Sequence, residues 1–531
     1  MLILQNVVYA HPNKDLLFDN INLIIHTQDK IALIGNNGAG KSTLLHMIAG
    51  NLLPQAGTIK TDVKPYYVPQ HFGQYNHCTV AKALQVADKL SALHAILNGD
   101  VTAHNMTVLD DDWSIEERCQ EALAHWGLDD IDLFRPMAAL SGGQKTKVFL
   151  AGIAIHRPGL VLLDEPSNHL DAKSRQVLYN YIQTTNDTLI VVSHDRTLLN
   201  LLNSVYELSK RGVTVYGGNY TFYAEQKAVE ANALTEELKS KEKALRKAKE
   251  VERDAMERQQ KLDARGKKKQ EKAGLPTILM NTLRNSAEKS TAKMKDVHAG
   301  KISAISGEVN QLRKELPEKD KMRIGFDNAA LHKGKILIMA KEINYRYGEH
   351  WLWPAALSFQ VTSGQRIALK GGNGTGKTTL IRLMLGDLQP ATGTMDSAVT
   401  KAIYIDQEYS LINNTLTVYE QLQQYNEGYL QEHELKSKLT HFLFTRLDWD
   451  KSCAVLSGGE KMRLVLCCLT VSRQSPDMII LDEPTNNLDI QNISILTDAI
   501  SEYEGTLIVV SHDAVFLEEV GVQEEIVLAE S

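Results

Sequence analysis

Residues 35–42 have the types and the spacing needed to hold a phosphate chain. Their sequence, GNNGAGKS, matches the pattern GxxxxGKS. In such a segment the glycines let backbone N–H groups curl around a β-phosphate, Lys41 reaches the β- and γ-oxygens, and the Ser42 hydroxyl can ligate Mg²⁺. An apolar run from Ile31 to Gly35 precedes the segment and a helical pattern follows it. This strand, loop and helix context favours a nucleotide site over a chance match.

Two carboxylates end another apolar run, at residues 160–165. Asp164 would hold Mg²⁺ through water, and Glu165 could orient or polarise an attacking water. His194, beyond a further apolar run, could contact a γ-phosphate, and Gln70 could reach the metal or the water. Each signal alone has an ordinary explanation, because polar turns, structural histidines and turn glutamines also follow strands.

A second candidate anion site lies in LSGGQ, residues 140–144. Serine and glycine ahead of a helix-compatible run expose backbone N–H groups at a helix N-terminus, which favours an anion. One copy of the pattern does not require two phosphate sites. The residues alone therefore leave open what this second site faces.

The same motifs recur in the same order in the second half of the chain. Lys377 follows Lys41 by 336 residues, and Glu483 follows Glu165 by 318. Several separately weak signals return together, so the repeat is strong evidence for two similar units. The second set consists of GGNGTGKT at 371–378, Gln407, LSGGE with Ser457–Glu460, LDEP with Asp482 and Glu483, and SHD with His512. The first copy is 21 residues longer between Gln70 and Ser141, which predicts a small insertion at about 88–112 that offers another contact surface.

The segment between the repeats, residues 224–325, differs in charge from the rest of the chain. It holds 25 Lys and Arg against 17 Asp and Glu, a balance of +8 in a chain of net charge −7, so the remainder carries −15. It contains no proline or glycine before Gly266, which predicts a long helix from about Tyr223 to Lys272. Apolar residues at spacings of three and four in the return segment, from Ile302 to Leu316, predict an antiparallel partner.

The far end of this predicted hairpin mixes apolar residues with a cationic excess. An ordinary charged helix would present a solvated face, but this tip cannot bury its apolar residues against itself, which favours contact with a polyanion such as RNA. The candidate RNA-contacting residues are Lys267, Lys268, Lys269, Lys272, Ile278, Leu279, Met280, Leu283, Arg284, Lys289 and Lys293.

Composition bounds the class of protein. At 531 residues, 43% hydrophobic and 23% charged, the chain is long enough for several cores. Its five cysteines show no metal-binding spacing, which fits a reducing cytoplasm. There is no export signal and no run of the roughly 18 apolar residues that a membrane span needs. We expect a cytoplasmic α/β protein with three parts, 1–223, 224–325 and 326–531, and no membrane insertion.

The chain resembles the F subfamily of ATP-binding-cassette ATPases (ABC-F). The resemblance is carried by LSGGQ and LSGGE, by LDEPSNHLD and LDEPTNNLD, by the two SHD motifs and by the basic helical spacer. The resemblance covers nearly the whole chain. It implies two tandem P-loop ATPase domains, joined by a long helical hairpin, that close head to tail over two ATP molecules and Mg²⁺. The LSGG segment of each cassette would then face the phosphate loop of the other.

The resemblance assigns roles to residues of both cassettes. Glu165 and Glu483 carry over as catalytic carboxylates, with His194 and His512 as switch histidines. The implied metal set is Ser42, Gln70, Asp164, Thr378, Gln407 and Asp482. The implied ATP-binding set is Gly35, Asn36, Asn37, Gly38, Ala39, Gly40, Lys41, Ser42 and Thr43 with Ser457, Gly458, Gly459 and Glu460, then Gly371, Gly372, Asn373, Gly374, Thr375, Gly376, Lys377, Thr378 and Thr379 with Ser141, Gly142, Gly143, Gln144 and Tyr347.

The two cassettes depart from each other at two places. Tyr347 fits the aromatic residue that commonly stacks on adenine in this family, whereas the first cassette has His11 at the matching place. Asn487 stands where the first half has His169. The catalytic residues are otherwise intact in both halves, so we expect two competent but unequal sites.

Proteins of this family bind the ribosome at the tRNA exit site and direct the interdomain arm toward the peptidyl-tRNA and the peptidyl-transferase centre. The resemblance therefore implies a monomeric ribosome-associated ATPase that relieves stalling or protects from antibiotics. Two alternatives remain open: the motor of a membrane exporter whose spanning subunit is encoded elsewhere, and a DNA-associated structural ATPase.

Overall fold

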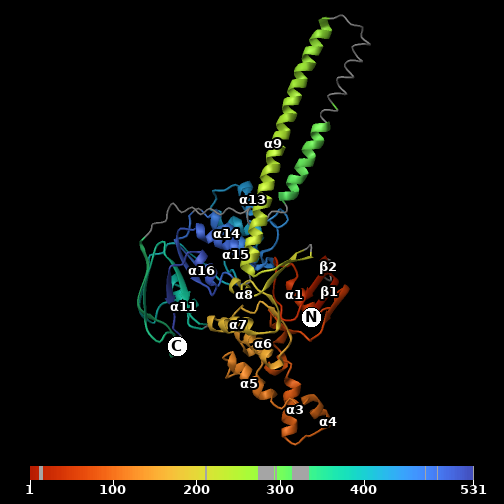
Figure 1. The fold of residues 1–531 in the computed structure, drawn as a ribbon. Helices are drawn as coiled ribbons and strands as arrows, with labels where there is room; N and C mark the ends of the chain where they lie inside the picture. The colour runs from red at the N-terminus through yellow and green to blue at the C-terminus, as the bar shows by residue number, and fades with distance from the viewer. Residues whose placement is uncertain are drawn as a thin grey trace. The chain divides into compact units, whose positions relative to one another are not determined.

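The computed structural model describes residues 1–10, 16–209, 212–272, 292, 296–313, 334–372, 374–472, 474–486 and 488–529. The chain forms two compact units, Met1–Tyr223 together with Met322–Ser531, and Ala224–Lys321. The first unit contains two similar α/β cassettes and the second is helical (Figure 1). Among the described residues, every helix is too short or too polar to traverse a lipid bilayer.

A six-stranded sheet lies at the centre of the first cassette, in the order β5-β6-β7-β3-β8-β9. All neighbouring strands are parallel except β8 and β9. Every residue of β6 and β7 is buried, as expected for parallel strands covered on both faces. The strands are β3 (Lys30–Ile34), β5 (Tyr66–Val68), β6 (Leu160–Asp164), β7 (Thr188–Val192), β8 (Ser204–Ser209) and β9 (Gly212–Tyr216).

Two hydrophobic cores cover the faces of this sheet. One joins it to α1 and to an antiparallel sheet of order β2-β1-β4, through residues such as Leu4, Leu45 and Leu162. The other joins it to the remaining helices, through residues such as Leu150 and Leu178. The elements are β1 (Leu2–Ala10), β2 (Leu16–Ile25), β4 (Ala56–Thr61), α1 (Lys41–Ile48), α2 (Val80–Ala83), α3 (Ala87–Leu97), α4 (Ala103–Leu109), α5 (Ile115–His125), α6 (Gly142–His156), α7 (Ala172–Thr184) and α8 (Arg196–Leu199).

The second cassette repeats this plan. Its parallel sheet has the order β16-β17-β18-β14-β19, and an antiparallel sheet has the order β13-β10-β15. The strands are β10 (Ile336–Asn344), β11 (Arg346–Tyr347), β12 (His350–Trp351), β13 (Leu357–Thr362), β14 (Arg366–Lys370), β15 (Thr392–Ser397), β16 (Ala402–Ile405), β17 (Met478–Asp482), β18 (Thr506–Val510) and β19 (Glu524–Val527). The helices are α11 (Lys377–Leu385), α12 (Val418–Tyr425), α13 (Glu432–His441), α14 (Gly458–Val471), α15 (Ile490–Glu502) and α16 (Ala514–Glu519).

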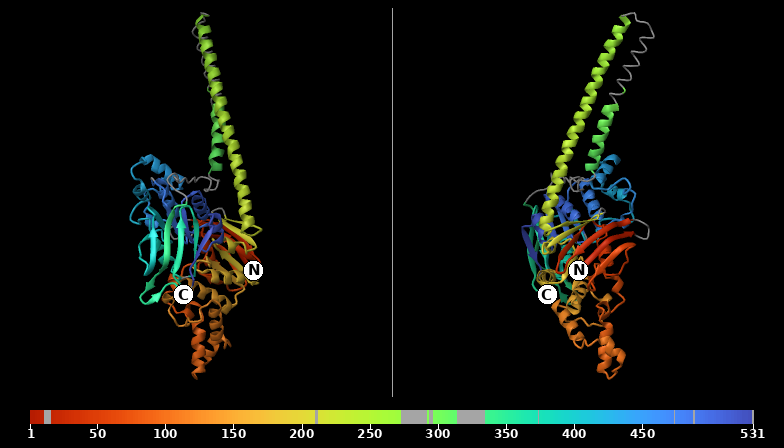
Figure 2. Two further views of the ribbon diagram at one scale, coloured as in Figure 1. Left: turned by 90° about the vertical axis from the view of Figure 1, so that its left-hand side faces the viewer. Right: turned by 45° about the vertical axis from the view of Figure 1, so that its right-hand side comes forward.

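The extra length of the first half falls where α3 and α4 lie. These two helices and α5 form a helical lobe at one end of the first cassette (Figures 1 and 2). Leu90, Leu93 and Leu109 bury the lobe against the main core of the cassette. The lobe is therefore part of the folded cassette.

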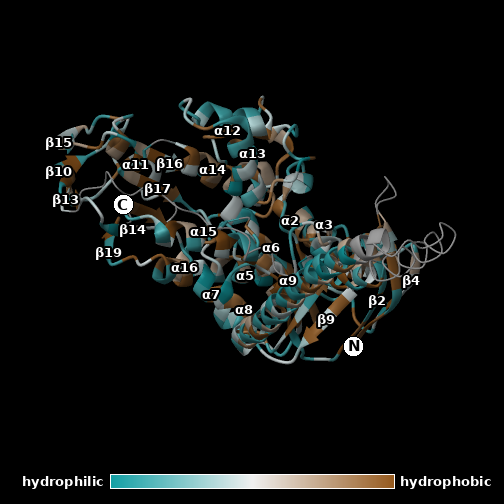
Figure 3. Cartoon of the chain, turned by 90° about the horizontal axis from the view of Figure 1, so that it is seen from above, coloured by the Kyte–Doolittle hydropathy of each residue, from teal (hydrophilic) through white to brown (hydrophobic). Residues whose placement is uncertain are grey.

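The helical unit consists of one very long helix and a shorter helical segment that packs on it. Helix α9 (Tyr220–Lys272) is 53 residues long and mostly hydrophilic (Figure 3). Residues 296–313 are also helical, with Val309 and Leu312 buried. Lys241 Nζ lies 2.5 Å from a Glu308 carboxylate oxygen across the pair. The predicted fold class, two tandem α/β cassettes with a helical hairpin between them, is confirmed for the described residues.

Helix α9 begins three residues before the predicted start at Tyr223. The side chain of Asn219 accepts a hydrogen bond from the Phe222 backbone N–H at 3.2 Å, which caps the first turn. The cap was visible in the sequence as an asparagine ahead of the helical pattern. At the other end, Lys267, Lys268, Lys269 and Lys272 lie on the last turns of α9, whereas the other predicted tip residues, between Ile278 and Lys293, fall outside the described residues.

Candidate nucleotide sites

Each phosphate loop ends in a glycine that no other residue can replace without strain. Gly40 precedes α1 with φ of 95°, and a Cβ there would lie 2.5 Å from the Phe18 ring. Gly376 precedes α11 with φ of 88°, and a Cβ there would lie 2.5 Å from the Leu352 side chain. The left-handed turn therefore packs closely on Phe18 of β2 in the first cassette and on Leu352, just after β12, in the second. It leaves backbone N–H groups of each helix N-terminus available to an anion.

The two loop lysines fold back onto their own loops. Lys41 Nζ donates hydrogen bonds to the carbonyls of Gly35 at 2.7 Å and Asn36 at 3.3 Å. Lys377 Nζ donates hydrogen bonds to the carbonyls of Gly371 at 2.9 Å and Gly372 at 2.8 Å. Burial lowers the pKa of both lysines, while nearby carboxylates, first among them the catalytic glutamate candidates, oppose the shift. Both ammonium groups are thus held beside their loops, where a phosphate can replace the carbonyls.

The carboxylate at the end of each buried strand is held by a tyrosine. Tyr67 donates a hydrogen bond to Asp164 at 3.1 Å, and Tyr404 donates one to Asp482 at 2.8 Å. Burial raises the pKa of both aspartates. The Asp164 Oδ1 atom is buried without a hydrogen-bond partner among the described residues, and Ser42 lines the same cavity and lowers the pKa of this carboxylate. An unpartnered oxygen beside a hydroxyl fits a hard cation such as Mg²⁺, which prefers oxygen ligands.

The residue that follows each of these strands is a glutamate, and it forms a pair with a histidine. Glu165 has φ of 51° and Glu483 has φ of 49°, so both adopt a left-handed backbone that non-glycine residues rarely take. His194 Nε2 lies 3.2 Å from Glu165 Oε1, and His512 Nε2 lies 3.4 Å from Glu483 Oε1. Burial raises the pKa of Glu165 to about 8 and of Glu483 to about 7, and it lowers that of His194 to about 3 and of His512 to about 4. Burial thus favours the uncharged form of both pairs.

The first site is shared between the cassettes. A cavity of about 410 Å³ is lined by Lys41, Ser42, Gln70, Asp164, Glu165 and His194 of the first cassette and by Ser457 of the second. The Asn37 backbone N–H also donates a hydrogen bond to Asp489 of the second cassette at 3.1 Å. The structure therefore brings together residues of one phosphate loop and one LSGG segment that are far apart in the sequence.

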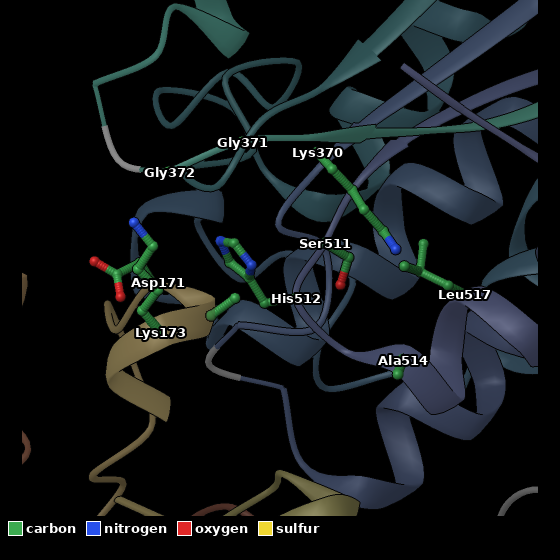
Figure 4. A pocket seen from close by; sticks show the side chains of 10 residues that line it. Asp171, Lys173, Lys370, Gly371, Gly372, Ser511, His512, Ala514 and Leu517 are labelled. Atoms are coloured by element: carbon green, nitrogen blue, oxygen red, sulfur yellow. The ribbon is translucent and has the colours of Figure 1, made fainter. Parts of the chain in front are cut away.

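The second site is divided into two cavities. The larger, of about 660 Å³, is lined only by second-cassette residues, including Tyr347, Lys377, Gln407, Asp482 and Glu483. The smaller, of about 340 Å³, lies between Lys370, Gly371, Gly372 and His512 of the second cassette and residues 171–173 of the first (Figure 4). Ser141 lines neither cavity. The predicted pairing of Ser141–Gly143 with the second phosphate loop therefore stays a prediction.

Both LSGG segments begin a helix through a capping box. Ser141 accepts a hydrogen bond from the Gln144 backbone, and the Gln144 side chain accepts one from the Ser141 backbone at 2.9 Å. Ser457 and Glu460 make the same pair of bonds at the start of α14. Because the Gln144 and Glu460 side chains serve as caps, the anion would meet the serines and the glycine N–H groups.

Two further predicted residues, Tyr347 and Thr43, line the cavities, whereas three others fall outside the described residues. Tyr347 is 57% exposed, bonds Thr379 through its hydroxyl at 3.0 Å and lines the larger second cavity. Its first-cassette counterpart, His11, falls outside the described residues, as do Asn373 and Asn487. Thr43 lines the first cavity.

Sequence reasoning missed Tyr67, Tyr404, Asp171 and Asp489. A signal was present for each pair, because Tyr404 follows Tyr67 by 337 residues, the same offset as between the two glutamines, and Asp489 follows Asp171 by 318. Their recurrence at these offsets marked all four as candidates, together with the neighbours that also repeat.

Comparison with known proteins identifies the family. The family model described as ABC transporter matches residues 18–168 and 355–486, more than half of the chain. The ATP-binding protein YdiF of Bacillus subtilis (strain 168) is 30% identical, in an alignment that covers 97% of this chain and 78% of that protein. The ribosome protection protein VmlR of the same organism is 29% identical, over 97% of this chain and 84% of that protein. The ABC transporter F family member 5 of Arabidopsis thaliana is 27% identical, over 97% of this chain and 73% of that protein.

Solved structures share the fold at lower identity. The archaeal ribosome recycling factor aABCE1, solved with the archaeal ribosomal stalk protein aP1, superimposes with a TM-score of 0.60 and 18% identity, over 98% of this chain and 87% of that chain. Both cassettes carry the complete motif order, and these alignments to the curated relatives cover 97% of this chain. The chain therefore belongs to the ATP-binding-cassette family, in its ABC-F subfamily, and is an ATPase whose cassettes bind and hydrolyse ATP.

Proposed function

We propose that this ATPase binds the ribosome while ATP holds its two cassettes together, and that it dissociates after hydrolysis. Its interdomain arm, residues 224–325, would enter from the exit site toward the peptidyl-tRNA and the peptidyl-transferase centre, to relieve stalling or protect from antibiotics. The observation that carries this proposal is the charge of the arm, +8 against −15 for the remainder. A cationic helical arm on an acidic body directs RNA binding to the arm. The relation to VmlR, a ribosome protection protein, supports the same conclusion.

The arrangement of the first site supports a role for each of its predicted residues. Lys41 and the N–H groups of the phosphate loop bind the phosphates, and Ser457 contacts the γ-phosphate from the other cassette. Ser42, Asp164 and Gln70 would hold Mg²⁺, which when bound would offset the negative charge of the phosphates. The second site uses Lys377, with Thr378, Asp482 and Gln407 as its metal residues.

Glu165 and His194 act on the water and the γ-phosphate. Glu165 accepts a proton from the attacking water. At the same time the water oxygen bonds to the γ-phosphorus, and the bond between the γ-phosphorus and the ADP oxygen breaks. His194 lies beside Glu165 and donates a hydrogen bond to the γ-phosphate. Glu483 and His512 take the same roles in the second site.

The proposal is tested by trapping the ATP-bound state. The double variant Glu165→Gln/Glu483→Gln, incubated with ATP, should sediment with ribosomes, because both cassettes stay closed. With ADP the same protein should stay in the supernatant. A double variant that stays free of ribosomes with ATP refutes the proposal.

A second experiment separates the arm tip from general charge. The triple variant Lys267→Gln/Lys268→Gln/Lys269→Gln should weaken ribosome binding about tenfold at physiological salt, because three phosphate contacts are lost. The matched control is Lys243→Gln/Lys247→Gln/Lys249→Gln, which removes the same charge from exposed positions nearer the start of α9. Equal weakening by both variants would show that the tip has no special role.

A further inference from the structure

Each switch histidine is followed by an aspartate that caps a short helix. Asp195 follows His194 and accepts hydrogen bonds from two backbone N–H groups in the first turn of α8, at 3.0 and 3.2 Å. Asp513 follows His512 and accepts one such bond at the start of α16, at 3.0 Å. An N-cap fixes the entry of the chain into its helix. The start of each short helix is therefore held within two residues of a switch histidine.

These two short helices are joined across the boundary between the cassettes. Arg196 is the first residue of α8, and Glu519 is the last residue of α16. Arg196 Nη1 lies 2.7 Å from both carboxylate oxygens of Glu519. Both bonds have the length of charge-assisted hydrogen bonds, and Figures 1 and 3 show the two helices near each other. The helix that follows one switch histidine is thus tied to the helix that follows the other.

The charge of Arg196 is compensated by the second cassette. Only 9% of this residue is exposed, and its Nε atom is buried without a hydrogen-bond partner among the described residues. Removing a guanidinium group from water is costly unless an anion compensates its charge. Because Glu519 supplies that anion from α16, the ion pair specifies how the two helices meet.

The residues of this ion pair are not repeated, although the motifs around them are. At the offset of 318 that relates the catalytic residues, Ala514 stands where the first cassette has Arg196. Leu201 stands where the second cassette has Glu519. Neither Ala514 nor Leu201 carries a charge, so the exchanged positions cannot form the equivalent pair.

Helix α8 is also connected to the second site through its own cassette. Tyr179 of α7 donates a hydrogen bond to Asp195, and residues 171–173, where α7 begins, line the smaller cavity of the second site. Ala514 and Leu517 of α16 line the same cavity (Figure 4). Helix α8, which starts beside the histidine of the first site, therefore contacts two helices that reach the second site.

We propose that Arg196 is a positioning residue that couples the two nucleotide sites through its contact with Glu519. Closure around ATP at one site brings α8 and α16 together, and this contact sets the position of the switch histidine at the other site. The affinity of each site for ATP therefore rises when the other site is occupied. The inference rests on closure of the cassettes over ATP, which is one part of the proposed function, and is independent of ribosome binding.

The test measures how the rate of ATP hydrolysis depends on ATP concentration, for isolated protein without ribosomes. With two coupled sites, the unchanged chain should give a Hill coefficient of about 1.5, between about 1 for independent sites and about 2 for complete coupling. Arg196→Gln removes the charge, so it should lower the coefficient to about 1 and raise the half-saturating ATP concentration about fivefold. The kcat at saturating ATP should change less than about twofold, because the catalytic glutamates and the switch histidines remain.

A variant of the partner residue shows whether the two residues act as a unit. Glu519→Gln should lower the Hill coefficient as Arg196→Gln does, and the double variant should show no further loss. Losses that add in the double variant would overturn the proposal. The Glu519 side chain is 40% exposed, so its substitution disturbs the fold little. If Arg196→Gln does not fold, Glu519→Gln decides alone: a coefficient of about 1 supports the proposal, and an unchanged coefficient refutes it.

Single-site backgrounds separate coupling from a local effect. In the Glu165→Gln background only the second site turns over, and in the Glu483→Gln background only the first. Because coupling is reciprocal, Arg196→Gln should raise the half-saturating ATP concentration by about the same factor in both backgrounds. A rise that is confined to one background would show that Arg196 acts on that site alone, and it would overturn the proposal.

The matched control is Arg118→Gln. Arg118 also binds a carboxylate, that of Asp112 at 3.0 and 2.9 Å, but both residues belong to the first cassette. This variant should keep the Hill coefficient of the unchanged chain. An equal loss in Arg118→Gln, or a coefficient of about 1 in the unchanged chain, would overturn the proposal. Sedimentation of the Glu165→Gln/Glu483→Gln variant tests ribosome binding separately, so the two proposals can fail independently.

Discussion

The two nucleotide sites of this ABC-F protein are built from the same motifs and are not the same site. The first is a single cavity of about 410 Å³ that includes Ser457 from the opposite cassette. The second is split into cavities of about 660 and 340 Å³, and the opposite cassette contributes residues 171–173 to the smaller one. Repetition of the motifs therefore gives each site the same proposed catalytic groups, but it does not determine how the two cassettes meet around them.

The difference arises at positions outside the motifs. Arg196 reaches from the first cassette to Glu519 of the second, whereas Ala514 stands at the place equivalent to Arg196. A buried cation requires a nearby anion or a use for its charge, while an apolar side chain requires only packing. Small changes beside identical motifs are thus enough to make two sites unequal.

The largest expected effect comes from the catalytic glutamates. The double variant Glu165→Gln/Glu483→Gln should lower kcat for ATP hydrolysis about a hundredfold, because neither site retains a general base. Each single variant should keep measurable turnover at the other site, and a phosphate-release assay of the two singles measures their inequality. Complete loss of activity in either single variant would show that the sites cannot act separately.

Glycines of the LSGG segments should respond unequally to alanine. A Cβ at Gly459 would lie 2.2 Å from the Asn492 amide nitrogen, whereas one at Gly142 would lie 3.5 Å from His169. Gly459→Ala should therefore lower the free energy of unfolding by about 1–3 kcal/mol, as overpacking does. Gly142→Ala should change it by less than about 0.5 kcal/mol, since its contact is an ordinary one. Denaturant unfolding measures both variants. Gly142 is the first glycine of its segment and Gly459 the second of its own, and similar values would show that the space at these two positions does not decide the response.

Tyr347 offers a smaller test of the second site. In the Glu165→Gln background, Tyr347→Ala should raise KM for ATP about fivefold, because stacking on the adenine ring is lost. Tyr347→Phe keeps the ring and loses only the hydroxyl contact with Thr379, so it serves as the control. Equal effects of alanine and phenylalanine would assign the role to the hydroxyl instead of the ring.

The smallest effect should come from the tyrosines that hold the metal-site aspartates. Tyr404→Phe and Tyr67→Phe each remove one hydrogen bond to a carboxylate, Asp482 or Asp164. Each should raise KM for Mg·ATP about threefold at its own site, since one such bond contributes little net free energy. Steady-state kinetics in the two single-site backgrounds would show this. A much larger increase in KM at one site would mean that the aspartate of that site depends more strongly on its tyrosine.

The parts of the site that follow local rules could be predicted from the sequence. The structure has three such features as expected: a strand that ends at Asp164, a glycine loop ahead of α1 and a serine that caps α6. Each of them depends only on residues close by in the sequence. The long helix α9 was predicted on the same grounds, although its start was placed three residues late because the Asn219 cap was overlooked. The internal repeat then raised weak single motifs to a firm assignment.

The amino-acid sequence by itself determined the family, the order of the elements and which side chains can act on a phosphate, because these depend on short-range patterns and on their repetition. Only the tertiary structure decided that Asp489 bonds Asn37 and that Arg196 meets Glu519. Such contacts join residues more than 300 positions apart, and nothing local in the chain encodes them. They depend on how two folded surfaces pack, which is settled only after each cassette has formed.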